Sequence, residues 1–292
     1  MSNATAQLHD VTLKPADFRK IKQLAHERFG LDLKDGKEAL VAARLGKHLR
    51  ERGFNSFSQY YDRVLSDPSG DTLIELIDSL TTNHTSFLRE RAHFDLLARV
   101  VDEELRNAAT IQIWSAASSS GEEPYSLVMS LLAGSGGAPP IELGEARRRF
   151  RILATDISTR VLGMAKRGVY PAERFREVPE AWKRMFLLRG EGSSAGLYKI
   201  RPEIASLVEF SRLNLIEPFT HRRMMHVIFC RNVMMYFDKA TQQDIVSRLT
   251  ECLAPGGYLF VGHSESLTGI EHELQYVRPA VYRRKRGGLR GS

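Results

Sequence analysis

The chain has 292 residues, of which 42% are hydrophobic and 26% are charged, and its formal net charge is +7. This composition is typical of a soluble globular protein, and the length suits two domains or one large one. No apolar run approaches a membrane span, and the N-terminal stretch MSNATAQLHD lacks the basic start and apolar core of a secretory signal. The two cysteines, Cys230 and Cys252, predict neither a disulfide framework nor a zinc site, which fits a reducing cytoplasm.

The excess positive charge lies partly in three short clusters, at residues 147–149, 222–223 and 283–286. Such an excess suits nucleic acid, an anionic membrane or an acidic protein as partner. The sequence has no zinc-finger spacing, no aromatic pattern of an RNA-recognition module and no long basic helix. We therefore expect no nucleic-acid partner and no insertion into a membrane.

Four amphipathic patterns in the first third of the chain predict helices, because apolar residues recur there at helical spacing. The patterns are Phe18, Ile21, Leu24 and Ala25, closed by Gly30; Val41, Leu45 and Leu49, closed by Gly53; Phe57, Tyr60, Tyr61 and Val64, before Pro68; and Leu73, Ile74, Ile77 and Leu80. They predict a small all-helical domain over residues 1–90, followed by a linker helix at 91–108.

The second of these helices has an unusually basic polar side, formed by Arg44, Lys47, His48, Arg50 and Arg52. A charged helix face is commonly just solvated. It could equally be a docking surface for an acidic helix of a partner. Both interpretations remain open at the level of sequence.

From residue 109 to residue 292 the pattern changes to strands that alternate with helices, which predicts a parallel α/β sheet. The expected strands are Ile111–Ala116, Phe150–Thr155, Val227–Cys230 and Tyr258–Gly262. The alternation breaks between Gly168 and Leu215. There Tyr198–Arg201 and Val208–Leu213 look like short antiparallel strands, so we expect an inserted small β unit at roughly 170–213.

The segment IQIWSAASSSGEEPYSLVM, residues 111–129, predicts a strand, a tight loop of small residues and a helix. Ser120 and Glu123 have the spacing of a capping box, and Pro124 is tolerated in a first helical turn. The shape is that of a nucleotide-binding turn, but the order G-x-G-x-x-G is missing. Glu122 and Glu123 would repel a phosphate at this helix N-terminus, so we expect a nucleoside ligand without phosphates.

Polar side chains follow several of the expected strands. Asp156 ends the second strand, Asn214 and Leu215 follow the Val208 strand, and Arg231 and Asn232 follow the Val227 strand. Open α/β sheets bind ligands at the carboxyl ends of their strands, so these residues together favour a nucleoside pocket. Asp156 could instead cap the next helix, although Ser158 can do so itself.

Seven ordered segments give the sequence a specific resemblance. LTTNHTSFLRE, WSAASSSGEEPYSLVM, ATDIS, LNL, FCRNVMMYFD, PGGYLF and GHSESL are similar to those of the chemotaxis receptor methyltransferases, the CheR family. The resemblance covers nearly the whole chain. Departures are small: Ser118 and Ser120 stand where many members have Ala or Cys and Thr, and His84 falls at a variable position.

The resemblance implies a Rossmann-like α/β methyltransferase domain with an inserted antiparallel β subdomain, preceded by an all-helical domain. It implies S-adenosyl-L-methionine as cofactor, S-adenosyl-L-homocysteine as product and no metal. Implied contacts are Asn83, Thr85 and Arg89 on the N-terminal side, Glu122 or Glu123 at the ammonium group, Asp156 at the ribose, Asn214 and Leu215 at the adenine, and Arg231 and Asn232 near the centre.

The implied reaction is methylation of glutamate side chains of chemotaxis receptors to γ-methyl esters, with Arg89 and Tyr236 as catalytic residues. His263 is interpreted as structural, because a glutamate ionised at pH 7 gives up no proton. The implied substrate contacts are Arg44, Lys47 and Arg50 for the helical cytoplasmic domain of the receptor, and Gly190, Gly192 and Gly196 for a receptor tail peptide. We expect a cytoplasmic monomer.

Two alternatives use the same pocket: a methyltransferase that acts on another protein carboxylate, and a regulatory module that binds the cofactor without turnover. The two acids in the first loop disfavour a dinucleotide oxidoreductase. The sequence contains neither N-P-P-Y nor a catalytic P-C pair, which disfavours a nucleic-acid methyltransferase. The receptor, its methylated glutamates and the sensory pathway are not encoded in these motifs.

Overall fold

The computed structural model describes residues 11–81, 85–221 and 223–286. The chain divides into two compact units. The first runs to residue 83 and includes the short segment Tyr236–Asp238, and the second comprises residues 84–235 and 239–292. Within the described ranges, no helix combines the length and the apolar character needed to cross a membrane.

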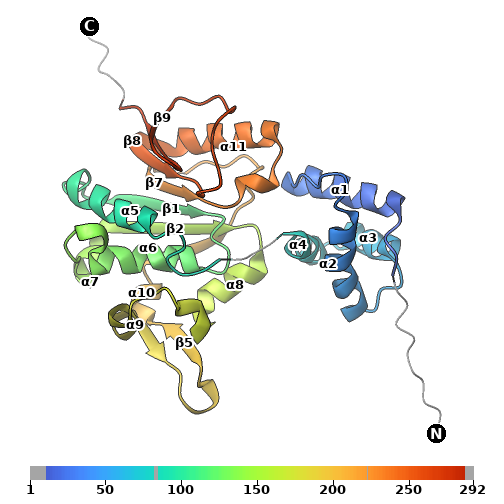
Figure 1. Cartoon of the computed structure of the whole chain (residues 1–292), viewed down its shortest axis with the longest axis horizontal. Coiled ribbons are helices and arrows are strands. Elements are labelled where there is room, and N and C mark those ends of the chain that lie inside the picture. The colour runs from blue at the N-terminus through green and yellow to red at the C-terminus, as the bar shows by residue number, and fades with distance from the viewer. Residues whose placement is uncertain (1–10, 82–84, 222, 287–292) are drawn as a thin grey trace. The chain divides into compact units, whose positions relative to one another are not determined.

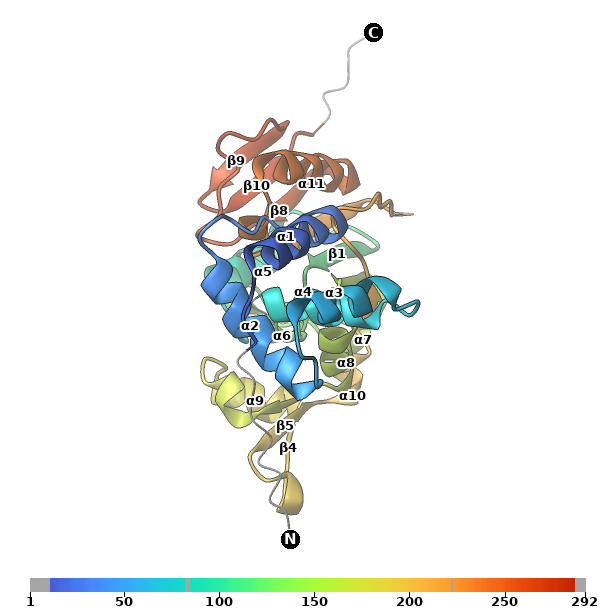
Figure 2. The ribbon, with the colours of Figure 1, turned by 90° about the vertical axis from the view of Figure 1, so that its right-hand side faces the viewer.

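The first unit contains the four expected helices, drawn in blue to cyan in Figure 2. They are α1 (Pro15–Phe29), α2 (Glu38–Glu51), α3 (Phe57–Ser66) and α4 (Asp71–Leu80). Gly30 ends α1 with φ of 69°, a left-handed conformation that glycine adopts without strain. The apolar stripes form one core, in which Ile21, Leu45 and Phe57 are fully or almost fully buried.

The segment Tyr236–Asp238 adds to this unit although it lies far along the chain. The Asp32 amide donates to the carbonyl oxygen of Tyr236 at 2.8 Å, and Leu31 forms an isolated antiparallel bridge with Phe237. His26 also lies 2.7 Å from the Asp238 carboxylate. The sequence pattern gave no signal for these contacts between distant segments.

The second unit is built on a seven-stranded sheet with the order β6-β2-β1-β7-β8-β10-β9 (Figure 1). Its strands are β1 (Ile111–Ala116), β2 (Phe150–Asp156), β6 (Val208–Arg212), β7 (Met225–Cys230), β8 (Leu253–Phe260), β9 (Leu274–Arg278) and β10 (Val281–Arg284). The first five strands in this order are parallel to their neighbours, whereas β10 and β9 are antiparallel. The expected parallel α/β sheet is confirmed.

Helices pack against this sheet and against one another. They are α5 (Ala92–Glu103), α6 (Glu122–Ala133), α7 (Leu143–Arg149), α8 (Thr159–Arg167) and α11 (Lys239–Cys252). Side chains of α5 and α6, such as Phe94 and Val128, share one buried apolar cluster with sheet residues such as Ile113 and Phe229. Burial of this cluster holds the helices against the strands. The polar loops that follow the strands are thereby kept in place.

A small antiparallel sheet is inserted after α8, with the order β3-β5-β4. Its strands are β3 (Val169–Pro171), β4 (Leu187–Arg189) and β5 (Leu197–Ile200), and two short helices accompany it, α9 (Glu180–Phe186) and α10 (Pro202–Ala205). One-turn helices complete the described structure at Ser135–Gly137, Ala172–Phe175, Gly192–Ser194 and Met234–Tyr236.

The interpretation of Val208–Leu213 as an antiparallel strand of this small unit, within residues 170–213, is wrong. The strand β6 (Val208–Arg212) pairs in parallel with β2 and is an outermost strand of the large sheet. Val208 is buried in the same apolar cluster as α6, and the ring of Phe210 lies 5.7 Å from that of Tyr125. This long-range packing selects the large sheet, and a five-residue strand carries no local signal of its pairing direction.

Candidate active site

Five neighbouring parallel strands deliver polar residues to one edge of the large sheet. Parallel strands in register end on the same side, so the loops that follow them meet there. The loops contribute Asn214 after β6, Asp156 at the end of β2, Ser118–Gly121 after β1, Arg231 and Asn232 after β7, and Gly262–Glu265 after β8. The prediction that Asp156, Asn214, Arg231 and Asn232 follow strands at one edge of the sheet is confirmed, whereas the loop after β8 was not predicted there.

The loop after β1 is held tightly against the elements around it. Gly121 has φ of 97°, and a Cβ there would lie 2.8 Å from the Cβ of Ala165 and 2.9 Å from the Tyr170 hydroxyl oxygen. The Tyr170 hydroxyl donates to the Ser120 carbonyl oxygen at 2.7 Å. Glycine is therefore required at this position by both conformation and space.

The predicted capping box between Ser120 and Glu123 is not formed, because Gly121 is the N-cap of α6 and no side chain caps it. The Ser120 hydroxyl donates instead to Glu122 Oε2 at 2.7 Å. Glu122 is fully buried and also accepts from Arg174 Nη1 at 3.1 Å. Ser120 is thus engaged by its near neighbour Glu122, and Glu123 is engaged by Ser115 and Arg231.

Glu123 has different partners from Glu122. Its Oε1 accepts from the Ser115 hydroxyl at 2.7 Å, and its Oε2 accepts from Arg231 Nη1 at 2.9 Å. Burial raises the pKa of Glu123, and the charge of Arg231 and the two hydrogen bonds offset this only in part. The two adjacent acids therefore belong to two separate networks.

Asp156 ties the loops after β1 and β2 together. Its Oδ2 accepts from the Ser119 amide at 2.8 Å and its Oδ1 from the Ser158 amide at 3.0 Å. The helix-capping role falls to Ser158, whose hydroxyl accepts from the Val161 amide at 3.2 Å. Each carboxylate oxygen has a second lone pair, so Asp156 can also accept hydroxyl donors of a ligand.

Arg231 is the centre of a buried ion network, with only 2% of its side chain exposed. Besides Glu123, its guanidinium donates from Nη2 to Glu90 Oε2 at 2.8 Å and to the Arg89 carbonyl oxygen at 2.6 Å. Burial alone would raise the pKa of Glu90, but the hydrogen bond and charge of Arg231 outweigh it and leave that pKa below its usual value. Arg231 thus connects the segment 85–90 to the first turn of α6.

Glu265 is an anchor that the sequence interpretation missed. Its Oε2 accepts from the amides of Asn232 and Gly262, each at 2.7 Å, and its Oε1 accepts from the Met234 amide at 2.8 Å. One carboxylate therefore fixes the loops after β7 and β8. The segment GHSES contains this residue, but the three amides that it binds lie too far apart in sequence to reveal its role.

Backbone strain is concentrated at the same edge. Among the described residues, the non-glycine residues with positive φ are Leu88, Glu90, Ala117, Ser119, Asn232 and Ala280. All but Ala280 belong to the segment 85–90 or to the loops after β1 and β7. Such conformations cost about 1–3 kcal/mol each and persist where surrounding contacts enforce them, which is typical of binding sites.

The other predicted site residues are placed as follows. The Thr85 carbonyl oxygen accepts from Arg174 Nη1 at 2.9 Å. Asn214 forms a local turn, with Oδ1 accepting from the Ile216 amide at 3.3 Å, and Leu215 beside it is buried. Tyr236 groups with the helical unit rather than with the sheet-edge residues. Asn83 lies outside the described residues.

The sheet-edge residues fit a nucleoside that carries hydroxyls and a positive charge. The acceptors there are Asp156, Asn214 and the two acids at the start of α6. Ser118 adds a buried hydroxyl that has no hydrogen-bond partner within the described part of the chain. A buried polar group without a partner is costly, so this hydroxyl is suited to contact a ligand.

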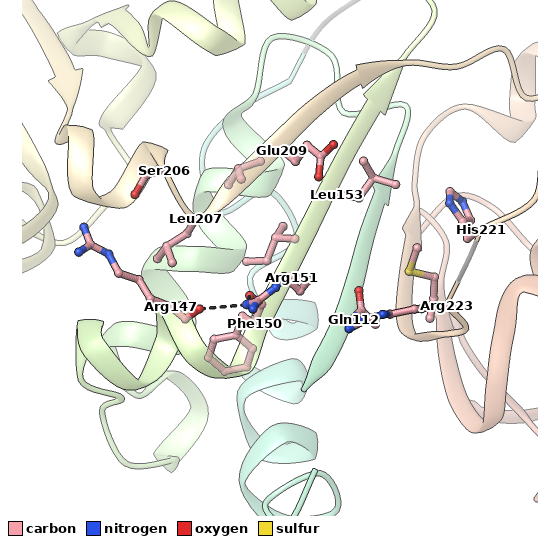
Figure 3. Close-up of a pocket in the computed structure, with 13 residues that line it drawn as sticks. Gln112, Arg147, Phe150, Arg151, Leu153, Ser206, Leu207, Glu209, His221 and Arg223 are labelled. Carbon is pink, nitrogen blue, oxygen red and sulfur yellow. Dashed lines mark hydrogen bonds between the residues drawn. The ribbon is translucent and has the colours of Figure 1, made fainter. Parts of the chain in front are cut away.

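A separate pocket of about 710 Å³ lies at the opposite, amino ends of the strands (Figure 3). Its lining includes Gln112 of β1, Arg151 of β2, Val208 of β6 and Met225 of β7. Arg151 Nη1 donates hydrogen bonds to the carbonyl oxygens of Arg147 at 2.9 Å and of Arg148 at 3.3 Å. This pocket shares no residue with the sheet edge described above.

Comparison with known families decides the family of the chain. The family model "CheR methyltransferase, SAM binding domain" matches residues 83–282, and "CheR methyltransferase, all-alpha domain" matches residues 16–81. The chain belongs to the CheR methyltransferase family. It is therefore an S-adenosylmethionine-dependent methyltransferase, and the sheet-edge residues described above lie within the matched SAM-binding domain.

Curated CheR relatives are similar over almost their whole length. The chain is 39% identical to "Chemotaxis protein methyltransferase 2" of Pseudomonas aeruginosa over 268 residues, which is 91% of this chain and 92% of the relative. It is also 39% identical to the "Chemotaxis protein methyltransferase" of Escherichia coli over 273 residues, 93% of this chain and 92% of the relative. The resemblance inferred from seven short segments is thereby confirmed.

Proposed function

We propose that this CheR methyltransferase transfers a methyl group from S-adenosylmethionine to glutamate side chains of chemotaxis receptors, and that it acts as a cytoplasmic monomer. The relatives in Pseudomonas aeruginosa and Escherichia coli are chemotaxis protein methyltransferases. The observation that carries the proposal is the set of acceptors at the sheet edge, joined to Arg89 through the buried Arg231. These acceptors suit a nucleoside without phosphates, and the Arg89 side chain is proposed to face the substrate carboxylate.

In this proposal different edge residues contact different groups of the cofactor. Asp156 accepts from the ribose hydroxyls, Asn214 and Leu215 flank the adenine, and Glu122 or Glu123 accepts from the ammonium group. Asn83, Thr85, Arg89, Arg231 and Asn232 complete the enclosure. When bound, the cofactor supplies an electrophilic methyl group on a sulfonium centre.

Methyl transfer to a carboxylate requires that the two reacting groups are correctly placed, and it requires no proton transfer. A glutamate side chain has a reference pKa of about 4.3, so it is already a carboxylate at pH 7 and needs no general base. In-line placement of reacting atoms can account for several kcal/mol of the barrier, about 7–11 in well-oriented model reactions. Arg89 is proposed to orient the carboxylate through charge-assisted hydrogen bonds, and Tyr236 to contact the reacting centre.

Transfer of a radiolabelled methyl group to membranes of the source cell tests the function. Base-labile label on receptor bands is expected, because a γ-glutamyl methyl ester is cleaved by mild base. Base-labile label on other proteins would indicate a different protein carboxylate as substrate. Tight cofactor binding without any transfer would indicate a regulatory module instead.

Replacing Arg89 by alanine should lower turnover far more than stability, because its proposed role is to orient the substrate. The Arg89 backbone carbonyl that holds Arg231 remains in the variant. We expect a loss of about 10- to 150-fold in kcat/KM, from a charged hydrogen bond of about 1.5–3 kcal/mol. The transfer assay and a thermal melt check this together. Normal specific activity with a large fall in melting temperature would make Arg89 a structural residue.

The basic face of α2 is proposed to dock the acidic helices of the receptor, but its residues are not equivalent. Arg44 Nη1 donates to the Leu80 carbonyl oxygen at the end of α4, and Arg52 pairs with Glu75 of α4. Lys47 and Arg50 are exposed, and the nearest acid to Lys47 is Glu51 at 3.8 Å. The surface available to a partner is thus centred on Lys47 and Arg50.

Reversing both Lys47 and Arg50 to glutamate should raise the apparent KM for receptor and leave cofactor affinity unchanged. The effect should shrink with added salt, because exposed charges are screened beyond about 10 Å at 0.1 M ionic strength. The control is the pair Arg19→Glu and Arg63→Glu, which makes the same charge change at exposed positions of α1 and α3. Equal receptor kinetics in both double variants would mean that the basic face is merely solvated.

The Gly-rich turn of the small sheet is the proposed contact for a receptor tail. Gly192 and Gly196 have φ of 56° and 86°, and a Cβ on Gly190 would lie 2.1 Å from the Ser194 carbonyl oxygen. Because β5 is central, β4 forms an edge of this sheet, and Leu188 on it is 40% exposed. An extended peptide can add to such an edge through backbone hydrogen bonds.

Fluorescence titration with C-terminal peptides of the organism's own receptors should therefore detect binding. A tether of this kind raises the local concentration of substrate without changing the chemistry. A scrambled peptide of the same composition is the control. If no receptor peptide binds below about millimolar concentration, a free energy of roughly −4 kcal/mol, the Gly-rich segment is only a turn.

A further inference from the structure

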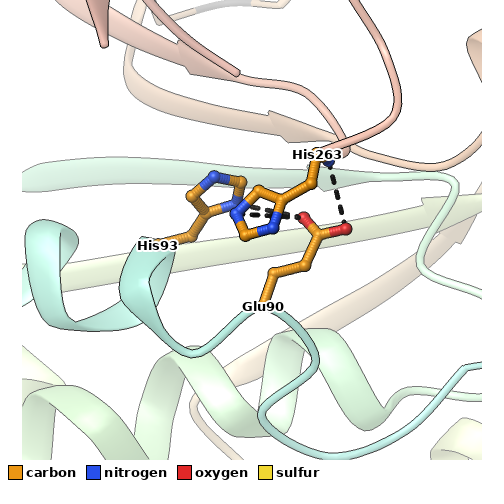
Figure 4. A group of neighbouring side chains, drawn as sticks. All are labelled: Glu90, His93 and His263. Carbon is orange, nitrogen blue, oxygen red and sulfur yellow. Dashed lines mark hydrogen bonds and ion pairs between the residues drawn. The ribbon is translucent and has the colours of Figure 1, made fainter. Parts of the chain in front are cut away.

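Three side chains converge beside Arg231 without being required to hold the cofactor. They are Glu90, His93 and His263, and one nitrogen or oxygen of each lies within 4.8 Å of the others (Figure 4). His93 lies in the first turn of α5 and Glu90 in the turn just before it, whereas His263 comes from the loop after β8. Sequence alone could not bring these residues together.

His93 is the unusual member of this cluster. It is 2% exposed, and neither ring nitrogen has a hydrogen-bond partner among the described residues. Its Nδ1 lies 3.5 Å from Glu90 Oε2, too far for a good hydrogen bond. A neutral imidazole has one nitrogen with a free lone pair, and here that pair is unused.

We propose that Glu90, His93 and His263 form a binding site for one Zn²⁺ ion. Two imidazoles and one carboxylate are a zinc donor set, whereas Mg²⁺ and Ca²⁺ prefer oxygen ligands. Three protein ligands leave the fourth tetrahedral position for water.

The three ligand atoms lie within 4.8 Å of one another and must move closer to bind one ion. Bonds of about 2.0–2.2 Å to Zn²⁺ place tetrahedral ligand atoms about 3.3 Å apart. Glu90 Oε2 lies 3.5 Å from His93 Nδ1 and 4.0 Å from His263 Nε2. The side chain of His263 is 53% exposed, so its rotation can close the longer gap and open a path for the ion.

Zinc binding at this site is coupled to the cofactor site. The same Glu90 Oε2 accepts from Arg231 Nη2 at 2.8 Å, so the ion and the guanidinium compete for one oxygen. The two carboxylates of Glu90 and Glu123 and the guanidinium of Arg231 have a net charge of −1. This net negative charge partly offsets the charge of the ion. Once Arg231 loses Glu90, the segment 85–90 is held less firmly against the sheet edge. Zn²⁺ should therefore weaken cofactor binding, and the cofactor should weaken Zn²⁺ binding by the same factor.

Calorimetric titration of the tag-free full chain with Zn²⁺ tests the site. We expect one ion per chain. The dissociation constant should be at least about tenfold higher in His263→Ala, because this variant lacks one of the three ligands. The matched control is His26→Ala, whose side chain is 51% exposed and lies in the other unit. Its Zn²⁺ affinity should equal that of the unchanged chain.

Two further measurements keep the proposal open to disproof. His93→Asn, with its fold checked by circular dichroism, should also lose affinity for Zn²⁺. Titration with S-adenosylhomocysteine should give weaker binding when Zn²⁺ is present, and His263→Ala should abolish that difference. An unchanged chain that binds no Zn²⁺, or variants at both histidines that bind it normally, would overturn the site. Equal cofactor affinity with and without bound Zn²⁺ would overturn the coupling.

Discussion

Replacing Arg231 by methionine should destabilise the methyltransferase unit by about 3–5 kcal/mol, because two carboxylates are then left buried without their cation. Methionine is similar in length to the apolar stem of arginine. It removes the charge, its hydrogen bonds and the contacts of the guanidinium carbon with the rings of Phe94 and Phe229, whose centroids lie 5.5 and 5.8 Å away. For a unit of this size the melting temperature should fall by roughly 6–20 °C. Differential scanning calorimetry of the two proteins measures the fall directly.

The pH dependence of this loss has a definite sign. Arg231 lowers the pKa of Glu90 in the folded state, so Glu90 contributes stability above its unfolded pKa of about 4.5 and loses it as pH falls through the folded value. The variant lacks this contribution, and its buried carboxylates become less costly when protonated. The difference in unfolding free energy between the two proteins should therefore shrink as the pH is lowered from 7 towards 4.

An exposed ion pair provides the control for Arg231. Arg106 pairs with Asp102 at 2.8 Å, but 67% of its side chain is exposed. Arg106→Met should cost no more than about 1 kcal/mol, as exposed pairs do. If Arg231→Met and Arg106→Met shift the melting temperature equally, the network around Arg231 does not hold the loops together.

Replacing Asp156 by alanine should weaken the binding of S-adenosylhomocysteine by about 10- to 150-fold, which corresponds to a lost charged hydrogen bond of roughly 1.5–3 kcal/mol. Two effects act in the same direction. The ribose hydroxyls lose their acceptor, and the amides of Ser119 and Ser158 lose the carboxylate that fixes both loops. Isothermal titration calorimetry measures the change.

Ser158→Ala separates these effects from simple damage to α8. That variant removes the cap of the helix and should cost about 0.5–2 kcal/mol of stability, but it leaves the Asp156 carboxylate in place. Its cofactor affinity should remain close to that of the unchanged chain. Unaltered affinity in Asp156→Ala would remove this residue from the cofactor site.

Much of this protein can be predicted from local patterns in its sequence. Four apolar stripes at helical spacing are enough to predict α1 to α4, because each helix must bury one face. The alternation of strands and helices predicts the parallel sheet, and the sheet implies which loops share an edge. The placement of Glu122 and Glu123 at a helix start indicates a ligand without phosphates, since charge there acts over short distances.

Other features depend on partners that are distant in the chain. Ser120 and Glu123 have the spacing of a capping box, yet Arg231 and Ser115 bind Glu123 more favourably. The strand β6 joins the large sheet because Val208 packs into its core. Glu265 gathers three amides that belong to two loops.

The sequence by itself determined the four N-terminal helices, the main parallel strands, that several polar loops share one sheet edge, and the family. Only the tertiary structure decided which carboxylate pairs with which cation, where β6 lies and that His93 meets Glu90 and His263. The physical reason is the range of the interactions. Helix and strand formation follow from neighbouring residues and the burial of one face, whereas buried ion networks satisfy each charge with whichever group the completed fold brings within reach.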